Sequence, residues 1–479
     1  MSFPRKPVGP RRAATGARHV AAPRGRKGLD VLLRTPLASV VTWPWFDRVA
    51  LWSLTRWFFP TSLAWAAATV ADGSVERFMA EVPLARLPSP ARPVTELGLR
   101  RIARLVQLHE AALADWDDAF FGPDEVESGT LAEVEQARRR AAQALMLGRA
   151  AVADLPILGE VPRAKFAIPG RAEVEARFGA AADRPAEAYR LDGSPVEIER
   201  SRTIVYDDRL EYWLRFPSPH KPMGDTAWAR VVEPLDAPEA PSVVFGHGLG
   251  VELEMLERIG DEDAIFVTEG IRIVRLEAPW HNRRRKPGTY GGEPFVATQP
   301  LGALDLFAAE VREFAVLIDW CRARGSRRVA LGGISLGALA SQLAASHAGA
   351  WPESMRPDAL LLLTTSNDVA GLAFTSSLAR GIGIDTALKA AGWSAEDLDR
   401  WRPLVDPAAT APLPPEDIVI LLGQVDDVTP FQRGMALAAG WNVPEENLFL
   451  RRQGHFTTAI GLLRDPAPLQ RLAQRLKRP

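Results

Sequence analysis

The chain has 479 residues, of which 47% are apolar and 24% are charged, and its formal net charge is −1 at pH 7. This length exceeds one ordinary domain, and the balanced charge excludes a global attraction to nucleic acid or to a membrane. The single cysteine, Cys321, excludes an intramolecular disulfide and any cysteine cluster that binds a metal; we interpret it as buried helix packing in a protein of a reducing compartment.

The first 30 residues form a basic arm. It carries eight Lys and Arg residues and no acidic residue before Asp30, and proline and glycine recur within it. Because such a composition cannot bury a core, residues 1–30 are predicted to be disordered. The arm lacks the apolar core and cleavage site of a secretory signal, so the sequence predicts a cytoplasmic protein.

Residues 31–189 are predicted to form a helical region that ends in a linker. Helical spacing covers 94–118 and 124–154, and Pro-rich and Ala-rich sequence follows at 155–185. Five of the fourteen tryptophans lie between residues 43 and 65, so we expect an apolar environment around their side chains. Residues 49–71 are long enough to span a bilayer, but Arg56 and Pro60 oppose a lipid-facing helix. A buried helix pair and a peripheral membrane contact through residues 1–71 both remain open.

The pattern changes at about residue 190, and residues 190–479 are predicted to form an α/β domain with a largely parallel sheet flanked by helices. Antiparallel edge strands are expected within 196–215 and at 227–233. Parallel strands are expected at 242–245, 271–276, 328–331, 360–364, 418–422 and 448–451, and prominent helices at 301–324 and 336–347. Residues 368–415, helical at 376–402 and Pro-rich after that, are expected to insert as a lid.

A candidate nucleophile lies between a predicted strand and a predicted helix. The sequence Gly333-Ile334-Ser335-Leu336-Gly337 has the G-x-S-x-G pattern, whose glycines allow close approach of the backbone at a strained turn. The helix that begins after Ser335 would aim free N–H groups at a reacting centre. An ordinary tight turn is the alternative interpretation.

A serine hydroxyl needs a base to take its proton and a third group to orient that base. Asp426 and His455 each follow a predicted parallel strand, at the sheet edge where catalytic groups gather. Their order along the chain, Ser then Asp then His, is that of α/β-hydrolases. Asp427 rivals Asp426, because two adjacent carboxylates cannot both face one imidazole.

Residues 240–460, about half of the chain, resemble the serine esterase and lipase branch of the α/β-hydrolase superfamily. The resemblance lies in the G-x-S-x-G elbow, the Gly-x-x-Asp turn at 423–426 and the Gly-His-Phe turn at 454–456. It implies an α/β-hydrolase fold for this part of the chain, to which the sequence pattern adds the N-terminal helical region and the helical lid. It also implies that Ser335 is the nucleophile, His455 the general base and then acid, and Asp426 the orienting carboxylate.

A second stretch, Gly246-His247-Gly248-Leu249-Gly250, resembles the oxyanion loop of the same superfamily. The resemblance implies that the N–H groups of Leu249 and Leu336 form an oxyanion hole. His247 is then expected to anchor the loop rather than to act as a second base.

The loop at 279–287 resembles that of an intracellular branch of the superfamily implicated in lipid acyl chemistry. Trp280 is expected to wall an acyl pocket, and the basic run from Arg283 to Lys286 to attract a carboxylate or phosphate head group. A solvated loop with a buried tryptophan is the alternative.

Together these features predict a serine-dependent hydrolase that cleaves a carboxylic ester or thioester through an acyl-enzyme on Ser335. The expected partner is a small ester, acyl or lipid molecule, with no nucleic acid, no metal and no organic cofactor. Serine as nucleophile argues against dehalogenases and epoxide hydrolases, which use aspartate. Acyl transfer by the same triad and a non-catalytic scaffold with a hydrolase fold remain alternatives.

Overall fold

The computed structural model describes residues 20–21, 43–82, 92–158, 161–191, 193–251 and 262–478. Most of the predicted disordered arm, residues 1–30, lies outside these ranges. Within the arm, Val20 forms an isolated bridge with Tyr206.

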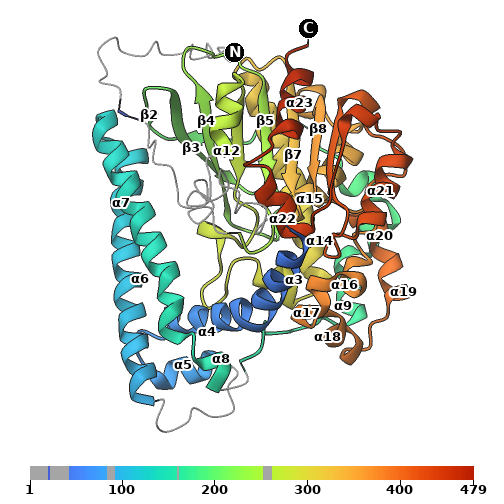
Figure 1. Ribbon diagram of the computed structural model, residues 1–479. Helices are drawn as coiled ribbons and strands as arrows, with labels where there is room; N and C mark the ends of the chain where they lie inside the picture. Colours follow the sequence, from blue (N-terminus) through green and yellow to red (C-terminus); the bar gives the residue numbers. More distant parts are fainter. Residues whose placement is uncertain are drawn as a thin grey trace, which may run out of the picture.

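Helices are the main elements of the described residues ahead of the sheet. They are α3 (Pro44–Ser53), the π-helical turn η1 (Leu54–Phe58), α4 (Phe59–Val70), α5 (Val75–Glu81), α6 (Arg92–Phe121), α7 (Ser128–Leu147), η3 (Gly148–Val152), α8 (Leu155–Leu158), α9 (Arg171–Asp183) and α10 (Pro185–Ala188). Helices α6 and α7 form a long hairpin along one side of the molecule (Figure 1). Helix α4 is buried over most of its length, and Nε1 of Trp65 donates to the carbonyl of Leu145 at 2.9 Å. Helix α3, in contrast, has no buried residue.

The described residues after α10 contain one sheet of ten strands in the order β1-β3-β4-β6-β5-β7-β8-β9-β10, with β2 paired to β3. The strands are β1 (Glu199–Arg200), β2 (Ile204–Val205), β3 (Arg209–Pro217), β4 (Thr226–Pro234), β5 (Ser242–Gly246), β6 (Arg272–Leu276), β7 (Val329–Ile334), β8 (Ala359–Leu363), β9 (Ile418–Gly423) and β10 (Leu448–Arg451). Strands β6, β5, β7, β8, β9 and β10 pair in parallel, whereas β1 to β4 are antiparallel to their neighbours. The predicted mostly parallel sheet is therefore confirmed.

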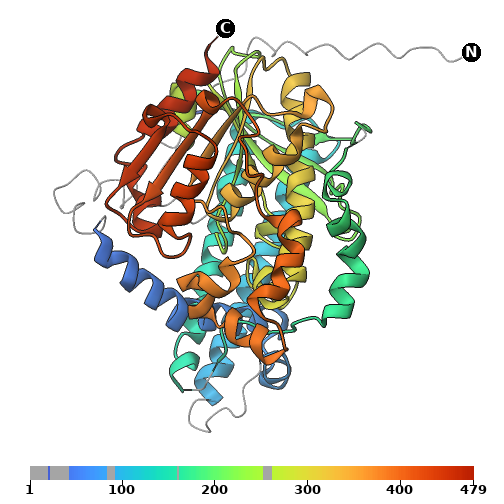
Figure 2. The same cartoon turned by 90° about the vertical axis from the view of Figure 1, so that its right-hand side faces the viewer.

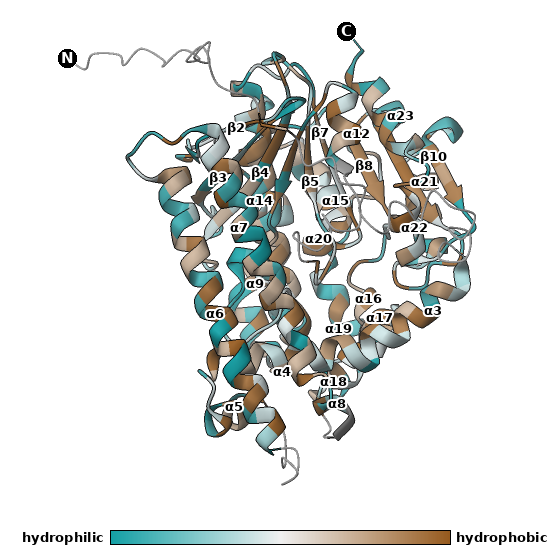
Figure 3. Ribbon diagram, turned by 60° about the vertical axis from the view of Figure 1, so that its left-hand side comes forward, coloured by the Kyte–Doolittle hydropathy of each residue, from teal (hydrophilic) through white to brown (hydrophobic). Residues whose placement is uncertain are grey.

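Alternate residues of each central strand face opposite layers of helices, as the two-residue period of a strand requires. In β8, Leu361 and Leu363 join a core with α12 (Glu262–Thr268) and α23 (Ala467–Leu476), whereas Leu360 and Leu362 join the core that contains α14 (Leu301–Ala323) and α15 (Leu336–Ala348). Figure 3 shows these central strands as the most hydrophobic part of the sheet. Cys321 lies fully buried in α14.

Shorter helices lie in the connections between the parallel strands and after the last of them. Outside the β8–β9 connection they are η4 (Asn282–Arg284), α13 (Glu293–Ala297), η5 (Glu353–Met355), α21 (Phe431–Gly440), η8 (Glu445–Asn447) and α22 (His455–Gly461). The β8–β9 connection contains α16 (Leu372–Thr375), α17 (Ser377–Ile382), α18 (Ile384–Ala390), α19 (Ala395–Leu398), η6 (Asp399–Trp401), α20 (Arg402–Val405) and η7 (Pro415–Asp417). These helices form an insertion below the sheet in Figure 1, next to α3.

Candidate active site

Ser335 lies on the turn between β7 and α15. Its backbone has φ 54° and ψ −118°, a region that non-glycine residues rarely occupy and that costs about 1–3 kcal/mol. The strain is maintained from both sides, because the Ser335 N–H donates to the carbonyl of Leu363 at 2.9 Å and the Gly337 N–H to that of His247 at 3.0 Å.

The two glycines that flank Ser335 are needed because the backbone closes on itself at this turn. A Cβ on Gly337 would lie 2.2 Å from the carbonyl of Gly246, and one on Gly333 would lie 2.3 Å from the carbonyl carbon of Gly337. Any larger residue would therefore displace the turn that carries Ser335. The strand order and this turn are those of the α/β-hydrolases. The chain has the α/β-hydrolase fold.

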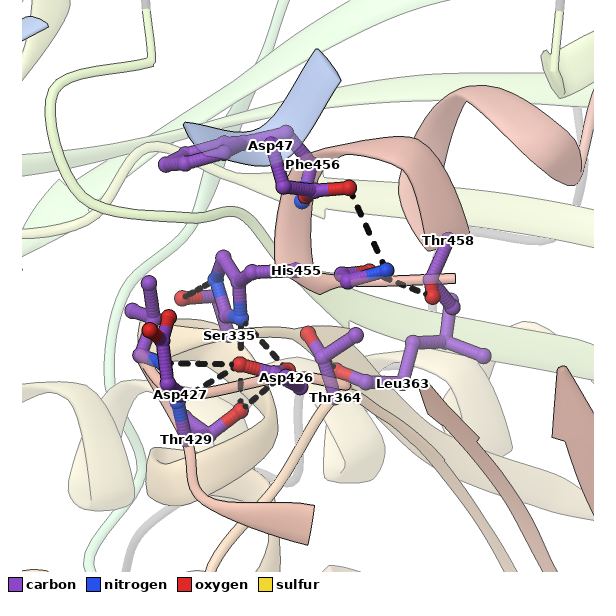
Figure 4. Close-up of polar contacts among 12 residues, drawn as sticks. Asp47, Ser335, Leu363, Thr364, Asp426, Asp427, Thr429, His455, Phe456 and Thr458 are labelled. Carbon is purple, nitrogen blue, oxygen red and sulfur yellow. Dashed lines mark hydrogen bonds and ion pairs between the residues drawn. The ribbon is translucent and has the colours of Figure 1, made fainter. Parts of the chain in front are cut away.

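The structure brings Ser335, His455 and Asp426 together from three separate connections of the sheet (Figure 4). Nδ1 of His455 lies 2.8 Å from Oδ2 of Asp426, and its Nε2 lies 2.9 Å from Oγ of Ser335. A carboxylate only accepts, so Nδ1 carries the proton and Nε2 is left to accept the serine hydroxyl. This is the geometry in which an imidazole can take the proton of a serine.

The surroundings of His455 change the pKa of its imidazole. Burial favours the neutral ring, but the charge of Asp426 and its hydrogen bond outweigh burial, with smaller contributions from Asp47 and Asp427, so the pKa is raised above 6.5. Asp426 itself is buried and accepts from the N–H groups of Val428 and Thr429 at 2.9 and 3.0 Å and from the Thr429 hydroxyl at 2.9 Å. These donors hold the carboxylate in place beside His455.

Asp427, the rival carboxylate, points away from the imidazole and is exposed. Its carboxylate accepts from the Ser377 hydroxyl at 2.8 Å, and its carbonyl accepts from the Ser377 N–H at 2.9 Å. Asp427 therefore holds the start of α17, in the inserted helices, instead of orienting the base.

Two buried histidines support the loop 246–250, which runs beside Ser335. Nε2 of His247 accepts the N–H of Ala278 at 3.1 Å, and Nε2 of His281 accepts the N–H of Gly250 at 3.1 Å. Burial lowers the pKa of His247 to about 4 and that of His281 to about 3, so both rings stay neutral and keep their acceptor nitrogens at neutral pH. His247 is thus bonded as a loop anchor, whereas the part played by His281 was not anticipated from the sequence.

Asp47 of α3 is a second residue that sequence reasoning missed. Its carboxylate accepts from the N–H groups of Gly454 at 3.2 Å, Phe456 at 2.7 Å and Thr457 at 3.2 Å, and from the Thr457 hydroxyl. These groups begin α22, whose first residue is His455, so Asp47 caps the helix that carries the imidazole (Figure 4). Gly454 makes room for this cap, because a Cβ there would lie 2.4 Å from the Asp47 carboxyl carbon.

An apolar cavity adjoins Ser335, between the sheet edge and the inserted helices. Among the residues described, its wall contains Leu249 and Leu336, and only Gln299, Ser335, Ser376 and Thr429 are polar. The insertion contributes Leu372, Leu378, Ala379, Ile382, Ile384, Leu398 and Trp401 to the wall. Since no described lining residue is charged, the cavity favours an uncharged, apolar group.

Trp280 does not wall this cavity, contrary to the sequence-based expectation. Its backbone has φ 65°, its side chain is buried, and it is not among the described lining residues. The loop directs the Trp280 side chain into the core, and Nζ of Lys286 lies 5.5 Å from the centroid of its ring.

The prediction that the basic run of 283–286 attracts an anionic head group needs correction for Arg283 and Arg284. Nη1 of Arg284 donates to Glu313 at 2.8 Å, and its Nε donates to Asp225 at 2.8 Å. Arg283 pairs with Glu277 and lies 4.0 Å from the ring centroid of Trp213. Arg284 therefore acts as a structural cation between Asp225 and Glu313, and Arg283 as one between Glu277 and the tryptophan rings, which include Trp116 of α6.

No family model matches the sequence, and no curated protein matches it. Among solved structures, the chain is similar to a cold-adapted esterase from an Arctic intertidal metagenomic library, with 19% identity, coverage of 58% of this chain and 98% of that one, and a TM-score of 0.40. It is also similar to acetyl xylan esterase 1 from Thermoanaerobacterium sp. JW/SL YS485, with 14% identity, coverage of 66% of this chain and 97% of that one, and a TM-score of 0.43. An S-formylglutathione hydrolase from Agrobacterium tumefaciens is similar with 15% identity, coverage of 57% of this chain and 98% of that one, and a TM-score of 0.39. Likeness at this level assigns no activity.

Proposed function

We propose that the protein is a serine-dependent hydrolase of carboxylic esters or thioesters with an apolar acyl group. The observation that carries this proposal is the continuous hydrogen-bonded series from Asp426 through His455 to Ser335, on a strained turn beside an apolar cavity. Each residue has the partner that its role in acyl transfer requires.

In the proposed reaction, Nε2 of His455 takes the proton of Ser335 while Oγ attacks the carbonyl carbon of the ester. The resulting oxyanion accepts hydrogen bonds from the N–H groups of Leu249 and Leu336, the second of which opens α15 and has no partner within that helix. His455 then protonates the departing alcohol or thiol as the carbon–oxygen or carbon–sulfur bond breaks. Water repeats the sequence on the acyl-enzyme, releases the carboxylic acid and restores Ser335.

The cavity supports the choice of acyl group. A chain of methylene groups gains about 0.8 kcal/mol for each buried CH₂ in an apolar site, whereas an uncompensated charge is costly to bury there. The inserted helices form much of the wall, so they would select the acyl group and exclude water from it.

Hydrolysis of a series of 4-nitrophenyl esters, from acetyl to octanoyl, tests the proposal. We expect kcat/KM to rise with acyl length until the cavity is filled, and Ser335→Ala to lower kcat by about 10⁴-fold or more at every length. Turnover by folded Ser335→Ala at the wild-type rate would overturn the proposal.

A further inference from the structure

Helix α3 and the turn η1 present an unusual exposed surface. Trp43, Trp45, Trp52 and Trp57 are 62%, 47%, 64% and 51% exposed, whereas the other ten tryptophans of the chain are buried or half-buried. Indole rings are costly to leave in water and are concentrated where an apolar phase meets a polar one. We refer to these four tryptophans, with Arg48, Val49 and Arg56, as the α3 face.

Five residues of the α3 face lie along one side of the helix, and the charged residues of the face are both positive. Trp45, Arg48, Val49, Trp52 and Arg56 follow one another at intervals of one, three or four residues, which places them along one side of the helix. The two arginines are exposed, and Asp47, the acidic residue of this segment, points to the opposite side and is bonded to α22. A stripe of tryptophan and arginine without exposed acid complements an anionic, partly apolar surface.

The helix that carries the α3 face packs on the candidate active site through its opposite side. Asp47 joins the rear of α3 to the helix of His455, and Thr55 of η1 packs against α17, where a Cβ on Gly381 would lie 2.6 Å from it. Helix α17 in turn provides Ala379 and Ile382 to the cavity wall. Figure 2 shows α3, in blue, running down to the orange inserted helices.

We propose that the α3 face docks the protein on an anionic lipid surface. The face would lie in the interfacial layer, since no described helix is long and apolar enough to cross a bilayer. Residues 1–42, which lead into the face, contain nine Lys and Arg residues against one Asp, which adds to the attraction. The choice of a lipid over a protein partner rests on the proposed function, because η1 packs against α17, and α17 forms part of the wall of an apolar cavity that suits acyl groups.

Flotation with vesicles tests the docking surface, using phosphatidylcholine alone and phosphatidylcholine mixed with phosphatidylglycerol. We expect the full chain and the Ser335→Ala protein to bind the mixed vesicles equally. The double variant Trp45→Ala, Trp52→Ala should bind about tenfold or more weakly, because two interfacial anchors are lost. Arg48→Gln, Arg56→Gln should weaken binding to mixed vesicles by about tenfold and remove most of its salt dependence.

The matched control is Leu97→Ala, Leu108→Ala on α6, which removes two apolar side chains that are 71% and 54% exposed and should leave binding unchanged. Binding that survives the tryptophan variant but is lost on deletion of residues 1–30 would assign docking to the arm and overturn the proposal. A wild-type dimer in light scattering that the tryptophan variant converts to a monomer, without vesicle binding, would instead make the face a contact between copies. Because the α3 face variants should still hydrolyse a short soluble ester, a failure of docking is distinguishable from a failure of the proposed function.

Discussion

Asp426 and Asp427 are neighbours in the chain but occupy different environments. The sequence could place a carboxylate after the strand that becomes β9, because acidic residues follow its apolar run. The family resemblance implied Asp426, but the pattern of residues alone could not decide between the two, since their directions depend on a turn in which Val428 and Thr429 donate their N–H groups to Asp426. That turn buries one carboxylate beside His455 and leaves the other exposed at the start of α17.

Substitution of the two aspartates should therefore have unequal effects. We expect Asp426→Asn to lower kcat by about 10³ to 10⁴-fold, because the amide can stabilise the wrong tautomer of His455 and cannot stabilise its charged form. Asp427→Asn, the matched control, should leave kcat within about threefold of the wild type, since it does not contact the imidazole. Equal losses in steady-state assays of the two variants would contradict the assignment of Asp426.

The pH dependence follows from the same pair. The pKa of His455 is raised above 6.5, and only the neutral imidazole can accept the serine proton, so kcat/KM should rise as the pH increases through that pKa. In Asp426→Asn the stabilising negative charge is gone, so the pKa falls and the acid limb of the profile should move to lower pH. The pH profile of kcat/KM for both proteins measures this shift.

At the scale of elements, periodicity located the strands well. Every parallel strand begins and ends within one residue of its predicted bounds except β7, which continues to Ile334. The extension has a physical reason, because β7 pairs with β8 through Gly333 and Ile334 up to the turn that carries Ser335. The cap on α22 was not foreseeable, because Asp47 lies about 400 residues earlier in the chain and periodicity says nothing of such distant pairs.

The cap gives α3 a testable positioning role. We expect Asp47→Ala to lower kcat by about tenfold with little change in KM, because the start of α22 and its imidazole lose their register with Ser335. Its charge also helps to raise the pKa of His455, so the acid limb should move to lower pH. Asp47→Asn should recover part of kcat by retaining an acceptor oxygen, but should keep the shifted pH profile.

The control for this variant is Asp124→Ala, an exposed acidic residue of the α6–α7 connection. It should change neither kcat nor the pH profile. If Asp47→Ala lowered the melting temperature while kcat and the pH profile stayed as in the wild type, Asp47 would be a structural cap without influence on the base.

At the scale of the whole molecule, the sheet and its parallel order were predictable because the central strands are continuous apolar runs. The environments of Trp280, Arg283 and Arg284 were not predictable from the sequence. Whether a basic loop meets solvent depends on what packs over it, and here Glu313, Asp225 and the α6–α7 hairpin cover it. The sequence pattern alone does not predict that packing.

The N-terminal helices also change how the whole molecule is understood. Helix α4 is buried in the main core, Asp47 of α3 caps the helix of His455, and α3 with η1 presents the α3 face to solvent. A region that the sequence presented only as a helical addition is therefore bonded to the candidate active site.

The central claim is that Ser335 is an activated nucleophile. A fluorophosphonate probe reacts with such a serine, and peptide mass spectrometry locates the modified residue. The account predicts stoichiometric labelling of the wild type at Ser335, much slower labelling of Asp426→Asn and no labelling of Ser335→Ala. An unlabelled wild type, or a label on another residue that persists in Ser335→Ala, would contradict it.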